Sequence, residues 1–206
     1  MALVKLNNRG VRSATTFGSI SGLGEMRFIK KLTASGDEDL SFVDGTDDVV
    51  LDDTYKEYIF TFNNMHPETQ EAHLCFQGNA AGGSGYDETI TSTFFRVQHM
   101  ENDSGTELAY YADSDQAQGT DFQRLVRNIN NDNDSSAAGW LRIFNPSSTT
   151  FVKHFISRCH SVGNAVHAAD CLAAGYFNTT SAIDEIQFKM NTGDIDAGDI
   201  CLYGIN

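Results

Sequence analysis

Short segments rich in β-branched and aromatic residues run through this chain from Met26 onward, separated by clusters of Gly, Asn, Asp and Ser. Segments of this kind are typical of β-strands, and the residues between them are those that form turns. Helical evidence is thin, because the two stretches that could wind, Ala165–Ala174 and Phe122–Asn128, lack a capping acid and an apolar stripe. We expect strands at Met26–Leu32, Glu57–Asn63, Ala72–Gln77, Thr91–His99, Glu107–Tyr111, Phe122–Val126, Gly139–Phe144, Phe151–His160, Ala173–Asn178, Ile183–Met190 and Asp199–Ile205.

Several of these segments alternate between two kinds of residue. Tyr58, Phe60 and Phe62 fall on one face of their segment, with Ile59 and Thr61 on the other. A period of two is expected of a half-buried strand. Many short strands with turns between them and no fixed repeat predict an all-β fold, an antiparallel β-sandwich of jelly-roll type.

The N-terminal residues differ from the rest of the chain. Residues 1–24 contain Lys5, Arg9 and Arg12 and no acid, whereas the 206 residues together carry a net charge of −14, which leaves −17 on residues 25–206. We expect two parts, an extended basic N-terminal arm at 1–24 and a single β-sandwich domain at 25–206. The arm is either a frayed terminus or a strap on an acidic neighbouring surface, and the segregated charge favours the strap.

The overall charge excludes some functions. With 14 Lys and Arg against 28 Asp and Glu, the chain repels nucleic acid and anionic membranes, so we expect neither as a partner. No apolar run approaches the ~20 residues that span a bilayer. The first residues lack the apolar region of a secretory signal, so we expect a soluble protein made in the cytosol.

The four cysteines, Cys75, Cys159, Cys171 and Cys201, are far apart and form no CxxC pair. In a reducing compartment such residues are usually small buried hydrophobes, so we expect free, buried thiols. Cys159 and Cys171 lie near His160 and His167, but this spacing lacks a zinc knuckle. Adjacent strand residues also point to opposite faces, so Cys159 and His160 should not share a metal.

Two further segments suggest ligand loops and fail as such. Gly78–Gly85 lacks the Lys-Ser/Thr ending of a phosphate-binding loop and lies between two strands, so we expect a wide turn. Asn128–Ser135 resembles a calcium loop, but Ser135 stands where Gly is required and Leu141 where a bidentate Glu is required. There is no GxSxG or HExxH motif, so we expect no catalytic residue, no cofactor, no metal and no enzyme.

Four stretches of the chain resemble virion structural proteins of tailed bacteriophages, especially those of marine and cyanobacterial hosts. These stretches are Met1–Ser13 (MALVKLNNRGVRS), Phe76–His99, Phe144–Ile156 and Gly175–Ile205, which includes GYFNTT and the terminal ICLYGI. Members of that group are described as structural, head-decorating or tail-fibre proteins, and they have no catalytic residues to transfer. Cys159, Cys171 and Cys201 depart from the resemblance.

The resemblance implies a capsid decoration (cement) protein on the outside of the virion, a dimer or trimer bound to the major capsid protein. Lys5, Arg9 and Arg12 would contact acidic capsid residues, and the arm could add a strand to a neighbouring sheet edge. The alternative is a tail-associated receptor- or carbohydrate-binding module. A polysaccharide-degrading enzyme is a weaker third alternative. A carbohydrate-binding module would need aromatic side chains in a shallow groove, with Tyr86, Tyr110, Tyr111 and Trp140 as candidates, although we expect Trp140 in the core.

Overall fold

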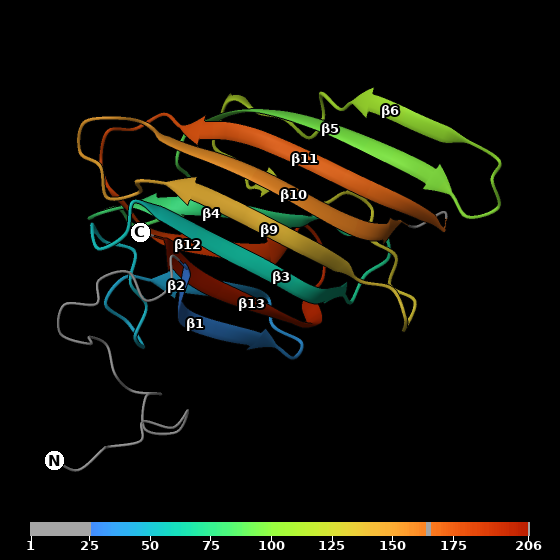
Figure 1. The fold of residues 1–206 in the computed structure, drawn as a ribbon, viewed down its shortest axis with the longest axis horizontal. Helices are drawn as coiled ribbons and strands as arrows, with labels where there is room; N and C mark the ends of the chain where they lie inside the picture. The colour runs from blue at the N-terminus through green and yellow to red at the C-terminus, as the bar shows by residue number, and fades with distance from the viewer. Residues whose placement is uncertain (1–25, 164–165, 206) are drawn as a thin grey trace, which may run out of the picture.

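A computed structural model describes residues 26–163 and 166–205 of the chain, and these residues form β-strands with no helix among them (Figure 1). The predicted N-terminal arm, with Lys5, Arg9 and Arg12, lies outside the described residues. The strands are β1 Met26–Ala34, β2 Asp39–Val43, β3 Glu57–Pro67, β4 Leu74–Ala80, β5 Ile90–Met100, β6 Thr106–Tyr110, β7 Ala117–Gly119, β8 Gln123–Arg124, β9 Ala137–Phe144, β10 Lys153–Gly163, β11 His167–Phe177, β12 Ile183–Met190 and β13 Ile195–Ile205.

The strands form two antiparallel sheets of unequal width. The larger sheet has nine strands in the order β1-β13-β3-β9-β10-β11-β5-β6, with β7 also paired to β5, and the smaller sheet has the order β2-β12-β4-β8. Figure 1 looks onto the larger sheet, with β2, β4 and β12 behind it. The predicted all-β sandwich is confirmed. The jelly-roll type stays a prediction from the sequence.

Each predicted strand segment overlaps an observed strand, but the prediction missed two strands and misjudged one stretch. The strands β2 and the three-residue β7 were not expected. The Asp and Ser residues of β2, and the Gln and Gly residues of β7, are typical of loops. Of the stretch Ala165–Ala174, which could wind by composition, the residues from His167 onward belong to β11, whose eleven residues all pair with β10 and with β5. Tertiary pairing overrides the helix preference of alanine there.

Aromatic side chains fill the space between the two sheets. Phe60 and Phe62 of the larger sheet contact Phe188 of the smaller sheet, with ring centroids 5.1 and 5.3 Å apart. All three are at most 1% exposed. Tyr58, Phe60 and Phe62 share one face of β3, as predicted, and the structure shows that this face points into the core.

The smaller sheet covers only part of the larger one, and a chain segment covers the rest of the inner face. After β8, Ile129 bridges Ala72, just before β4, to Gly163 at the end of β10. Nearby, the guanidinium groups of Arg96 and Arg127 lie 4.8 and 4.4 Å from the ring centroid of Tyr111. Among residues 26–163 and 166–205, no further sheet packs on the opposite, outer face of β5, β6, β10 and β11.

Candidate functional site

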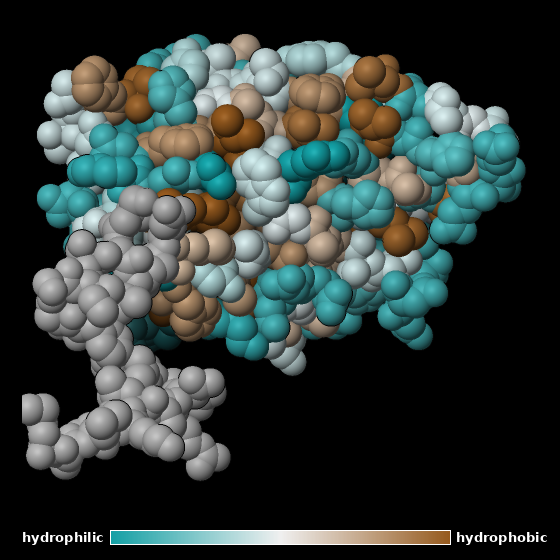
Figure 2. Space-filling view, in the orientation of Figure 1, coloured by the Kyte–Doolittle hydropathy of each residue, from teal (hydrophilic) through white to brown (hydrophobic). Residues whose placement is uncertain are grey.

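Large apolar side chains are exposed on the outer face of the larger sheet. We use "outer face" for the outward side chains of β9, β10, β11, β5 and β6. Figure 2 shows hydrophobic side chains gathered over these strands, in the upper part of the view. The most exposed are Phe95 (38%), Val97 (42%), Leu108 (70%), Tyr110 (55%) and Ile156 (44%). Contiguous exposed apolar surface of this kind marks an interaction site in a folded protein.

Strand register makes these side chains one continuous surface. Phe95 of β5 lies opposite Leu172 of β11 on one side and Tyr110 of β6 on the other. Val97, two residues along the strand, lies opposite Leu108. Directly opposed side chains on one face of a sheet are within contact distance. A single apolar patch is therefore formed by Phe95, Val97, Leu108, Tyr110 and Leu172.

The outer face carries little charge, and its charges are paired. Arg158 Nη2 lies 2.8 Å from Asp170 Oδ2 of the neighbouring strand, and Arg158 Nε also donates to that carboxylate. Arg142 Nη1 lies 2.6 Å from Glu57 Oε1 of β3. Exposed pairs of this type add at most ~1 kcal/mol of stability each. Their main effect is to leave the outer face close to neutral on a chain whose net charge is −14.

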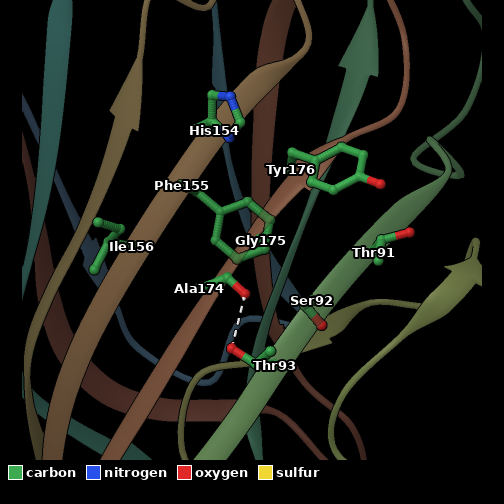
Figure 3. A pocket seen from close by; sticks show the side chains of 9 residues that line it. All are labelled: Thr91, Ser92, Thr93, His154, Phe155, Ile156, Ala174, Gly175 and Tyr176. Carbon is green, nitrogen blue, oxygen red and sulfur yellow. Dashed lines mark hydrogen bonds between the residues drawn. The ribbon is translucent and has the colours of Figure 1, made fainter.

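A shallow hollow of about 450 Å³ lies at one end of the outer face (Figure 3). It forms because Ala174 of β11 presents only a methyl group between Ile156 of β10 and Thr93 of β5, which are its register partners. In the next row His154 lies opposite Tyr176, with ring centroids 6.1 Å apart. The hollow therefore combines an apolar floor, two rings and the threonine hydroxyls of the rim.

The aromatic residues chosen from the sequence do not line this hollow. The prediction that Trp140 is a core residue is wrong. Trp140 is half-buried on the outer face of β9, one residue before the buried Leu141, and Arg142 lies over its ring at 5.7 Å. Tyr86 and Tyr111 are half-buried elsewhere, and Tyr110 is exposed on β6. Tyr176 was missed, although its alternation with the buried Phe177 could have indicated an outward ring.

The cysteines are free and buried, as predicted. Burial raises the pKa of the Cys75 thiol to about 12 and that of Cys171 to about 11, so both stay protonated and unreactive at neutral pH. Cys159 and Cys171 face each other in register on the inner side of β10 and β11. His160 points outward, so it does not join Cys159 in a metal site, and this agrees with the alternation argument.

The two loops tested as ligand sites have structural explanations. Gly78, Asn79 and Ala80 belong to β4 and pair with β12, so the wide turn expected at Gly78–Gly85 begins only after them and leads to β5 in the larger sheet. In the Asn128–Ser135 run, Asn130 and Asp132 hydrogen-bond each other through Asn130 Nδ2 and Asp132 Oδ2 at 2.8 Å. Over residues 26–163 and 166–205, no three His, Cys, Asp or Glu side chains are placed to hold a metal ion.

Comparison with known proteins identifies no relative of this chain. No family model, no curated protein and no solved structure matches it. In the described part of the chain, no helix has the length and apolar character needed to cross a membrane.

Proposed function

We propose that this chain is a non-enzymatic structural protein of a tailed-phage virion, a decoration (cement) protein on the outside of the head. The observation that carries the proposal is a near-neutral apolar face on an otherwise acidic β-sandwich. Such a face suits lasting contact with other proteins of a shell. The acidic remainder keeps crowded copies from associating at random. The resemblance to virion proteins supports the same assignment.

In this proposal the basic arm attaches the sandwich to the major capsid protein. Lys5, Arg9 and Arg12 pair with acidic capsid residues, while the arm itself adds a strand to an exposed capsid sheet edge. One exposed ion pair contributes at most ~1 kcal/mol. A shell holds many copies, and attachment of an oligomer at several points multiplies the effect.

Removing residues 1–24 is expected to abolish binding to purified heads. The substitutions Lys5→Gln, Arg9→Gln and Arg12→Gln together should weaken binding at least tenfold at low salt, because three favourable charge pairs are lost. Binding is measured by co-sedimentation of the protein with heads that lack it. Arg27→Gln with Lys56→Gln, which removes two exposed charges of the sandwich, serves as the control. Full binding by the deletion variant would contradict a role for the arm.

Copy number in purified virions tests the head assignment directly. A decoration protein of 22.6 kDa should be present at a level comparable with the major capsid protein. A few tens of copies per particle would instead place the chain in the tail. Quantitative mass spectrometry of the particles gives this number.

The hollow on the outer face favours a second candidate function, a tail-associated module that binds receptors or carbohydrates. Tyr176 and His154 offer ring faces at its edge. The Thr93 hydroxyl donates to the Ala174 carbonyl and the Thr91 hydroxyl accepts from the Gln118 amide, which leaves Thr93 an acceptor and Thr91 a donor for a ligand. Sugar rings bind proteins through this combination of an aromatic ring face and nearby polar groups. The apolar patch farther along the same face is not required by this alternative.

If the second candidate is correct, Tyr176→Ala should weaken binding of host-surface polysaccharide at least tenfold. The ring is one of the two ring faces at the hollow, so its loss removes a stacking platform. Isothermal titration with lipopolysaccharide-derived oligosaccharides measures the change. Tyr110→Ala, which removes an exposed ring outside the hollow, should leave the affinity unchanged. Absence of binding by the unaltered protein would leave the decoration function as the better explanation.

A further inference from the structure

We infer that the outer face is the surface on which a second copy of this chain packs, so that the protein is a face-to-face dimer. The resemblance to virion proteins led us to expect an oligomer but gave no surface for it. The inference depends on the composition, charge and size of the outer face, and it holds whether or not the protein binds a phage head.

Exposed apolar side chains are concentrated on this face. Five of the nine large hydrophobic residues that are exposed among the described residues belong to it, and four of them come from β5 and β6 within two adjacent rows. Burying these side chains against an equivalent surface removes apolar area from water, which is the main favourable contribution to association. The remaining four lie elsewhere: Met26 and Phe28 on β1, Phe151 before β10 and Val166 before β11.

Charge selects a second copy as the occupant. Two copies that each carry −14 repel one another unless the surfaces in contact are free of net negative charge. The outer face meets this condition, since Arg158 is paired with Asp170 and Arg142 with Glu57. In β6, the outward Leu108 lies opposite Val97, while the Glu107 carboxylate accepts a hydrogen bond from the Tyr111 hydroxyl at 2.7 Å.

The size of the face matches that of a stable dimer interface. Its three central strands, β10, β11 and β5, have 11 residues each and are flanked by the shorter β9 and β6. With strands ~4.8 Å apart and ~3.3 Å per residue, these five strands present roughly 700 Å². Specific interfaces bury about 800 Å² on each partner. Most homodimers have twofold symmetry, in which the same patch serves both subunits.

Paired charge substitutions on the face test the inference. Sedimentation equilibrium of the full chain between 1 and 100 µM is expected to give about twice the 22.6 kDa mass of one copy. The variant Val97→Asp with Leu108→Asp should raise the dissociation constant at least 100-fold, since it places carboxylates in the centre of the apolar patch. Phe151→Asp is the matched control, because Phe151 is also 70% exposed but lies in the loop before β10.

Each result supports or overturns the inference. A monomeric parent protein at 100 µM would overturn it, as would a double variant that stays dimeric, or a control variant that becomes monomeric. Salt separates the face from the basic arm as the contact. Association through the apolar face persists at 0.5 M NaCl, whereas dissociation at that salt would indicate contact through the arm and would overturn the inference. Far-ultraviolet circular dichroism checks that the variants remain folded, and Ile156→Asp gives an independent variant on the same face.

Discussion

Replacing Phe188 with alanine is expected to lower the free energy of unfolding by about 4 kcal/mol. The Phe188 ring is fully buried, and its centroid lies 5.1 to 6.3 Å from those of Phe42, Phe60, Phe62 and Phe76. It therefore joins the smaller sheet to the larger one at the centre of the core. Truncation removes buried apolar area and leaves a cavity that the strands on both sides cannot close. Urea denaturation monitored by circular dichroism measures the loss.

Phe151→Ala provides the control for this prediction. Phe151 is 70% exposed, so its removal should change the free energy of unfolding by no more than about 0.5 kcal/mol. A loss below about 1 kcal/mol for Phe188→Ala would show that the two sheets do not pack through this ring, and would contradict the sandwich core described above.

Lowering the pH from 6.5 towards 4 is expected to destabilise the protein through His73. Burial, together with the nearby Arg124 and Arg127, lowers the pKa of His73 from 6.5 to about 4. Its Nδ1 accepts a hydrogen bond from the Asn128 amide at 2.9 Å, a bond that the protonated ring cannot accept. The unfolded chain takes up a proton near pH 6.5 and the folded chain does not. The stabilisation that the neutral His73 ring gives to the folded state is therefore complete above pH 6.5. It is lost as the pH falls towards 4, which lowers the free energy of unfolding by up to about 3 kcal/mol.

The variant His73→Gln separates this effect from other titrations. Its amide oxygen can still accept the hydrogen bond but does not titrate, so its free energy of unfolding should fall less between pH 6.5 and 4 than that of the parent protein. His154→Gln, which replaces an exposed histidine on the outer face, should keep the full pH dependence. Equal slopes in the parent and in His73→Gln, from urea titrations at each pH, would refute the role of His73.

The strand segments could be predicted from the sequence because their signal is local. The pattern of Ile183–Met190 matches β12 to the residue, since Ile186, Phe188 and Met190 alternate with the half-buried Gln187 and Lys189. The prediction failed where non-local pairing decides the structure. The alanine-rich segment of β11 has no strand preference of its own and is extended because it lies between β10 and β5.

The candidate site could not be predicted, because alternation reveals two faces but not which one is covered. In β10, Phe155 is 1% exposed and its neighbour Ile156 is 44% exposed, although both are large and apolar. Lys153, a residue type that is usually exposed, shares the inner face with Phe155 and donates from Nζ to the Thr179 carbonyl at 3.1 Å. Residue type alone would have placed Lys153 outside and Ile156 inside.

The sequence by itself determined the all-β class, most strand positions and the separation of a basic N-terminal segment from an acidic remainder. These properties depend on side-chain type and on a period of two, which neighbouring residues specify. Only the tertiary structure decided which face of the larger sheet is covered, and hence that Phe95, Val97, Leu108 and Tyr110 form one exposed patch. The physical reason is that burial depends on which distant segments pack against a strand, and the strand's own sequence does not contain that information.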